Sequence, residues 1–319
     1  MGKGNSLIVL SHEKLLPIAT YLVKASRQIG IDEVVLVQLP EILRPIVNVP
    51  EILVSAITKA NAVISVVQRW PEETDAIWGG LTDICKKNKC KHVVLYDPDP
   101  SYFKNGGILA DYKEVDRKSK MVRQVLNSSK RVEVSSDTGT SVSFQVSATR
   151  LCSPIYSPDA LSSPSARDIL IQAPEGEVQG TPLEDTFNGK VAMDGAITGT
   201  GIPDTPITWT FEKGRVTSVD GPRVFLSALL EYVRRMNRNV GDLLGHSIAE
   251  FAVGTNDWAF FDENISNSEK VSGSVHFGIG HARGKEMFHM DGMLTKPSVT
   301  VTDKNDREIH LIEKGSIRV

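Results

Sequence analysis

The 319-residue sequence has few cysteines and no excess of charge of either sign. Its three cysteines cannot all pair, and Cys85 and Cys90 lie in the lysine-rich stretch CKKNKC, which lacks the spacing of a zinc site. We therefore expect reduced thiols in a cytoplasmic protein. With 36 Lys and Arg against 39 Asp and Glu, the net charge is −3. This balance argues against a protein whose main partner is the nucleic-acid backbone.

Long apolar runs and phosphate-binding glycines are also absent. No segment approaches the roughly 18 uninterrupted apolar residues of a membrane helix, and residues 1–11 are too short and too polar for a secretory leader. We thus expect no membrane association. The segment SHEKLLP follows the first predicted strand, where a nucleotide-binding protein has a Gly-rich turn, so a dinucleotide role is not expected. With 40% hydrophobic residues, the chain can still form a large core.

The first part of the chain alternates strand-like and helical patterns. Apolar runs rich in β-branched residues predict four strands, at residues 6–11, 33–39, 61–67 and 91–97. Amphipathic stretches with helical spacing lie between them, and a longer one follows at about residues 111–128. The pattern predicts a small parallel sheet covered by helices on both faces, which is a three-layer α/β domain over residues 1–129.

After residue 129 the pattern changes to an alternation of apolar and polar residues. Segments such as SVSFQVSATRL, ITWTFEKGRVTSVDG and IHLIEKGSIRV have this period of two, with turn signals between them. Such alternation is typical of antiparallel sheet. One helix is predicted within it, at about residues 223–237. Residues 130–319 are therefore predicted to form a mainly antiparallel, β-rich α+β domain.

The histidines are unevenly distributed. Five of the seven fall in the last quarter of the chain: His246, His276, His281, His289 and His310. Two of these lie in segments that the alternation predicts as strands. His276 lies in SGSVHFGIG, and His289 lies in MFHMDGML, two residues before Asp291. Because strand side chains alternate between faces, His289 and Asp291 should project from the same side.

A third strand-like segment, SIAEFAVGTN, carries an acidic residue among apolar ones. Glu250 there should share a strand face with Ile248 and Ala252, which would direct its carboxylate towards a core. A buried carboxylate is costly unless it is paired or bound to a metal. Two imidazoles and two carboxylates in these three segments fit a metal site better than a salt bridge.

The second domain resembles the metal-binding half of the M29 metallopeptidases, the aminopeptidase T type. The segments that carry this resemblance follow the family's order: APEGEVQGTP, FNGKVAMDGAI, ITWTFEKGRVTSVDG, IAEFAVGTN, SGSVHFGIG and MFHMDGML. The resemblance implies two divalent ions, zinc, manganese or cobalt, with one carboxylate bridging them. It assigns them five ligands: Glu177, Glu250, His276, His289 and Asp291. Glu175 would replace Glu177 if the loop register differed.

The activity that the resemblance implies is hydrolysis of an amide or peptide bond by a metal-activated water. The substrate would be a short peptide or another small molecule, and the default assembly a homodimer or a higher homo-oligomer. Two features differ from the family pattern: Arg283 stands in place of a functional Tyr, and the connection between His276 and His289 is shorter. His281 is the nearby candidate proton donor, so Glu250 and His281 are the candidate catalytic residues.

A second family also resembles this domain, the 2,5-dihydroxypyridine 5,6-dioxygenases, which cleave a hydroxylated pyridine ring with dioxygen at one Fe(II). These enzymes have a His at the position of Glu250. To act in the same way, this chain would bind Fe(II) with His276, His289 and Asp291. A non-catalytic binding protein on the same fold is the third hypothesis.

Overall fold

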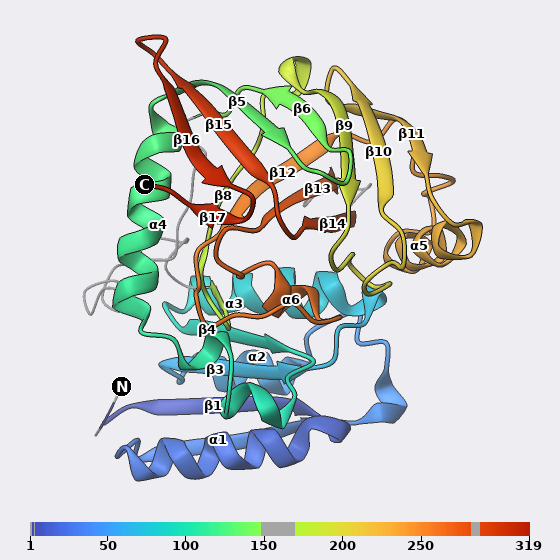
Figure 1. The fold of residues 1–319 in the computed structure, drawn as a ribbon. Helices are drawn as coiled ribbons and strands as arrows, with labels where there is room; N and C mark the ends of the chain where they lie inside the picture. Colours follow the sequence, from blue (N-terminus) through green and yellow to red (C-terminus); the bar gives the residue numbers. More distant parts are fainter. Residues whose placement is uncertain (1, 3, 148–169, 282–287) are drawn as a thin grey trace. The chain divides into compact units, whose positions relative to one another are not determined.

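The computed structural model describes residues 2, 4–147, 170–281 and 288–319, and of residue 281 only the backbone (Figure 1). The chain forms two compact units. The first unit contains the chain up to Lys104 and a short later strand, β7 (Leu170–Gln172). The second unit contains the described chain from Asn105 onwards, apart from that strand and Ala173.

The first unit is built on a five-stranded sheet of order β2-β1-β3-β4-β7, and all of its strand pairs are parallel. Its first four strands are β1 (Ser6–His12), β2 (Glu33–Leu39), β3 (Ala62–Val67) and β4 (Lys91–Tyr96). The parallel sheet predicted from the sequence is therefore confirmed. The edge strand β7 was not predicted, because three residues are too few to establish a period.

Helices cover both faces of this sheet. Alternate residues of β1 enter two separate cores: Leu7 and Val9 pack with α1 (Leu16–Gln28), while Ile8 and Leu10 pack in the cluster that includes α2 and α3. These two helices are α2 (Glu51–Ile57) and α3 (Leu81–Lys87), and the π-helical turn η4 (Asp75–Gly80) leads into α3. Short 3-10 turns connect the elements: η1 (Glu13–Leu15), η2 (Glu41–Leu43), η3 (Pro71–Glu73) and η5 (Pro100–Phe103). Cys85 and Cys90 are free thiols buried in the second of these cores.

The second unit contains two antiparallel sheets, as the alternation predicted (Figure 1). The larger has the order β11-β10-β9-β6-β5-β15-β16-β17. Its strands are β5 (Ser129–Ser135), β6 (Ser141–Phe144), β9 (Asn188–Met193), β10 (Ile207–Glu212), β11 (Arg215–Asp220), β15 (Ser298–Asp303), β16 (Glu308–Glu313) and β17 (Ser316–Ile317). The smaller has the order β14-β13-β12-β8, with β8 (Glu177–Gly180), β12 (Ile248–Gly254), β13 (Val275–His281) and β14 (Phe288–Leu294).

In the described residues of the second unit, the α-helices are α4 (Tyr112–Asn127), α5 (Arg223–Met236) and the single turn α6 (Ile265–Ser268), and the 3-10 turns are η6 (Gly107–Leu109) and η9 (Glu184–Thr186). The predicted boundary after residue 129 left α4 in the first domain, whereas the observed division assigns it to the second unit. The physical reason is its buried face, since Val122 and Leu126 pack in the core of the second unit. Among the described residues, no helix is long and apolar enough to cross a bilayer.

An aromatic core joins the two antiparallel sheets. The ring of Phe144 on β6 lies 4.9 Å from the ring of Phe251 on β12 and 5.9 Å from that of Phe277 on β13. Phe187 lies 4.9 Å from Phe211 on β10 and 5.5 Å from Phe277. Rings of this size account for much of the apolar area that a core buries. One face of the four-stranded sheet thus packs in this core, and the polar residues of the sheet must lie on its opposite face.

The first unit buries a histidine without a charged partner. His92 on β4 is fully buried, and its Nε2 and Nδ1 atoms lie 2.8 Å from the Ser65 hydroxyl and 2.9 Å from the Thr82 hydroxyl. Burial lowers the pKa of His92 from 6.5 to about 4. Between these values the unfolded chain binds a proton that the folded protein does not.

We predict that the first unit loses stability as the pH falls from 6.5 towards 4, by up to about 3 kcal/mol from His92 alone. Hydrogen exchange of the β4 amides, measured across this interval, reports the loss directly. In His92→Gln the fall should be smaller, because the group that binds the proton is gone. The matched control is His310→Gln, which removes an exposed histidine and should leave the pH dependence of wild type. An equal fall in His92→Gln would contradict the prediction.

Candidate metal centre

The polar face of the four-stranded sheet carries the residues predicted as metal ligands. Glu250 on β12 pairs with Gly278 on β13, and Gly278 pairs with Asp291 on β14. Residues in one such row lie on the same face of a sheet, so Glu250 and Asp291 flank a glycine. His289 and Asp291 share this face because they are two residues apart, as the sequence predicted.

The predicted neighbours of Glu250 are partly wrong. The register of β12 shifts between Ile248 and Glu250, so that Ile248 pairs with Ile279 while Glu250 pairs with Gly278. This bulge inserts one extra residue and turns Ile248 into the aromatic core, on the face opposite to Glu250. Only Ala252 stays on the face of Glu250. The carboxylate therefore points away from the apolar core, not towards it.

Three of the predicted ligands form the group that we call site A: Glu250, His289 and Asp291. The Nε2 atom of His289 lies 2.8 Å from Asp291 Oδ1 and 3.2 Å from Glu250 Oε2. The side chains of Glu250 and Asp291 are 18% and 11% exposed, and that of His289 is 29% exposed. The group is thus largely buried but remains accessible at His289.

A second group, site B, consists of Glu177, Glu269 and His276. His276 Nε2 lies 3.7 Å from Glu177 Oε2, and the side chain of His276 is only 2% exposed. Glu177, not Glu175, contributes the carboxylate to this group, on the register that pairs it with Gly254. The preceding Gly176 has φ +135°, and a Cβ there would lie 2.5 Å from the Cβ of Asn256. Only glycine therefore permits this entry into β8.

Glu250 connects the two sites. Its Oε1 atom lies 3.4 Å from His276 Nε2 of site B, while its Oε2 atom lies 3.2 Å from His289 Nε2 of site A. A carboxylate with one oxygen directed at each group has the arrangement of a bridging ligand. The five predicted ligands are thus brought together on one sheet face, but they divide into two adjacent groups.

Two residues of the centre were not predicted from the sequence, Glu269 and Lys270. Both follow α6 and are buried. The Nζ atom of Lys270 lies 2.9 Å from Glu177 Oε2 and 2.9 Å from Glu269 Oε1. Their segment, NSEKVSG, has neither a helical nor a strand period. The one available signal was an acidic and a basic residue next to each other in a predicted loop.

The charges that lie close together in this centre shift the pKa values of His276, His289 and Glu250. Burial alone would lower the pKa of His276, but its hydrogen bond to Glu250 and the charges of Glu177, Glu250 and Asp291 raise that pKa to about 9. The same kind of balance raises the pKa of His289, where the charge of Asp291 outweighs burial. Burial would raise the pKa of Glu250, but the hydrogen bonds and charges of the two imidazoles lower it. The carboxylates of this face therefore need cations beside them.

Two observations test whether these residues suit a metal ion. A Cβ on Gly278 would lie 2.6 Å from Asp291 Oδ1 and 2.8 Å from His289 Nε2, so the space above this glycine is bounded by ligand atoms of site A. The buried oxygens Glu177 Oε2 and Asp291 Oδ1 both face cationic groups, Lys270 Nζ at 2.9 Å and His289 Nε2 at 2.8 Å, so both oxygens are directed at sites of positive charge. Carboxylate and imidazole donors around such a space fit a divalent ion.

The other candidates of the sequence analysis lie outside the described part of the chain. The side chain of His281 is not described, although its backbone ends β13 opposite Phe288. Arg283 also lies outside the described residues. The roles predicted for them stay predictions.

Comparison with known proteins identifies the fold. The solved structure of wild-type AmpT from Thermus thermophilus matches this chain with a TM-score of 0.63 at 12% sequence identity, over 100% of this chain and 95% of that chain. AmpT is the Thermus aminopeptidase T of the M29 family, so the predicted resemblance is confirmed as a likeness of fold. No protein-family model matches the chain, and a search of the curated proteins finds no match.

We predict that Gly278→Ala weakens metal binding about 10- to 100-fold, because the new methyl group displaces ligand side chains of site A. Calorimetric titration with Zn²⁺ or Mn²⁺ measures the change. Gly241→Ala is the matched control, since no atom lies within 4 Å of the added Cβ. Equal affinities of the two variants would show that the space above Gly278 is not where the ion binds.

Proposed function

We propose that this protein is a metal-dependent hydrolase of the aminopeptidase type, which cleaves an amide or peptide bond of a short peptide or another small molecule. The observation that carries the proposal is the convergence of Glu250, His289 and Asp291 on one buried sheet face. The fold shared with aminopeptidase T supports it. The ion would be zinc, manganese or cobalt, held by site A.

A divalent ion, when bound, would supply Lewis acidity and lower the pKa of a coordinated water. The residues of the chain would do the rest. Asp291 and Glu250 would supply negative charge to the ion, and the partly exposed His289 would mark the side from which substrate enters. Thr198 would hold Asp291 in place, because its hydroxyl accepts a hydrogen bond from the Asp291 amide at 3.0 Å.

The ring-cleaving dioxygenase is a weaker alternative. Such enzymes hold Fe(II) with two histidines and one carboxylate. Here the required histidines are divided, since His289 groups with Glu250 and Asp291, whereas His276 groups with Glu177 and Glu269. Site A alone offers one imidazole and two carboxylates. This donor set differs from the triad of those iron enzymes and suits a Lewis-acidic divalent ion and hydrolysis better than dioxygen chemistry.

The decisive test removes ligands of site A one at a time. Glu250→Ala and His289→Ala should each lower the bound metal, and each should reduce hydrolysis of an aminoacyl-p-nitroanilide panel at least about 100-fold. Mass spectrometry of the purified protein gives metal content, and release of nitroaniline gives turnover.

Matched controls come from exposed positions of β16. Glu308→Ala and His310→Ala remove the same residue types from exposed positions in the same unit and should leave both quantities unchanged. If both site A variants keep the metal content and turnover of wild type, the proposal is refuted. Bound iron together with oxygen uptake on a dihydroxypyridine would instead support the dioxygenase.

A further inference from the structure

A buried lysine occupies site B. The side chain of Lys270 is 2% exposed, and its ammonium group lies 2.9 Å from Glu177 Oε2 and 2.9 Å from Glu269 Oε1. These two carboxylates are two of the three candidate ligands of site B, the third being His276. The site that would hold a second metal ion already contains a cation of the protein itself.

The backbone fixes this lysine where it is. The amide of Lys270 donates to the carbonyl of Asn267 at 3.1 Å, and its carbonyl accepts from the amide of Asn256 at 2.9 Å. The Asn256 side chain in turn donates to the carbonyls of Gly107 and Glu175, at 3.0 and 2.8 Å. These bonds fix the backbone of Lys270, and its ammonium group is held by the ion pairs with Glu177 and Glu269.

An ammonium group and a divalent ion compete for the same oxygens in site B. A metal ion needs its carboxylate oxygens at about 2.0–2.2 Å. An ammonium group between Glu177 and Glu269 uses those oxygens and adds repulsion between two cations that water cannot screen at such burial. By contrast, no lysine or arginine side chain of the described residues forms an ion pair with the site A residues Glu250 and Asp291.

We propose that Lys270 takes the place of a second metal ion, so that the centre binds one divalent ion, in site A, instead of the two that the resemblance to the family implies. This inference rests on the proposed function. The ammonium group balances the charge of Glu177 and Glu269 and offers N–H donors, but it has no exchangeable ligand position. Any activation of water is then confined to site A.

The number of bound ions tests the inference. The protein is loaded with Mn²⁺, desalted, and examined by native mass spectrometry and electron paramagnetic resonance. Wild type should carry one ion per chain, with the signal of an isolated Mn²⁺. Lys270→Ala should carry two, with the signal of a coupled pair, because site B regains its oxygens. Glu269→Gln, which keeps Lys270, should still carry one.

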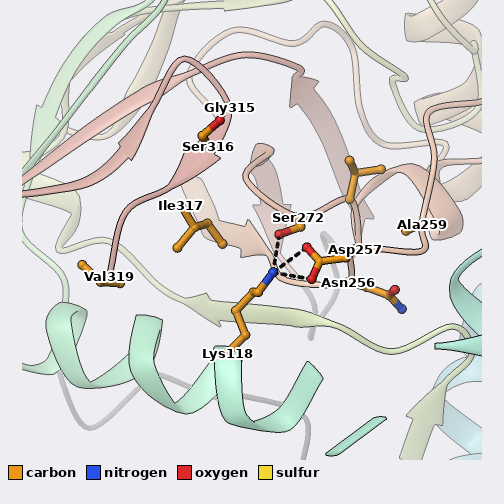
Figure 2. Close-up of a pocket in the computed structure, with 10 residues that line it drawn as sticks. Lys118, Asn256, Asp257, Ala259, Ser272, Gly315, Ser316, Ile317 and Val319 are labelled. Carbon is orange, nitrogen blue, oxygen red and sulfur yellow. Dashed lines mark hydrogen bonds and ion pairs between the residues drawn. The ribbon is translucent and has the colours of Figure 1, made fainter. Parts of the chain in front are cut away.

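The matched control is Lys118→Ala. Figure 2 shows the Lys118 ammonium directed at the carboxylate of Asp257 and the hydroxyl of Ser272, in a hollow that contains no member of site A or site B. Like Lys270, this lysine pairs with a carboxylate of the same unit, but Asp257 is 61% exposed. Its removal should leave one ion per chain.

The outcomes separate the two proposals. Two coupled ions in wild type, one ion in a folded Lys270→Ala protein, or loss of the ion in Glu269→Gln would each overturn the role of Lys270 while the hydrolase proposal stands. No bound ion in wild type would overturn the hydrolase proposal, and the inference with it. If Lys270→Ala does not fold, the wild-type signal and Glu269→Gln still decide the question.

Discussion

Carboxylates that are shielded from water on one face of the four-stranded sheet are the constraint on which the second unit depends. Glu177, Glu250 and Asp291 are each at most 18% exposed, and carboxylates at such positions are tolerated only beside cations. The strands cannot relieve this cost by rotating, because the rings of Phe251 and Phe277 pack their other face against the larger sheet. The apolar core thus forces the acids together, and the chemistry of the face follows from how their charge is balanced.

Small irregularities make this arrangement possible. The bulge in β12 lets Ile248 enter the core while Glu250, two residues later, faces the acids, which a regular strand does not allow. Gly278 leaves open the space between Glu250 and Asp291 that a Cβ would fill. The register that aligns these three residues also places His289 opposite Gly280, so the same strand pair fixes the imidazole. A single-residue slip would send every one of these side chains into the core.

The sequence indicated which residue types share this face, but it did not indicate their detailed geometry. The residue types and the two-residue spacing of His289 and Asp291 were enough to indicate a shared face, because strand alternation is a local property. The bulge was not predictable, since it depends on pairing with β13. Lys270 was missed because its segment has no period from which a face can be deduced. The helix α4 was recognised, but amphipathic spacing tells only that one face is buried, not which core it joins.

The balance of charge has a consequence for the kind of chemistry available. A divalent ion has exchangeable positions for water and substrate, whereas the Lys270 ammonium offers only N–H donors. Each oxygen of Glu250 has an imidazole beside it: His276 of site B lies 3.4 Å from Oε1, and His289 of site A lies 3.2 Å from Oε2. With the ammonium in site B and a divalent ion in site A, Glu250 would stand between two different kinds of cation. Site A would then activate water, and the ammonium in site B would only balance the charge of its carboxylates. The two sites are adjacent and share the carboxylate of Glu250. A dinuclear centre with the same fold would combine both tasks in its pair of ions, so a lysine in place of the second ion would change the reaction chemistry without changing the scaffold.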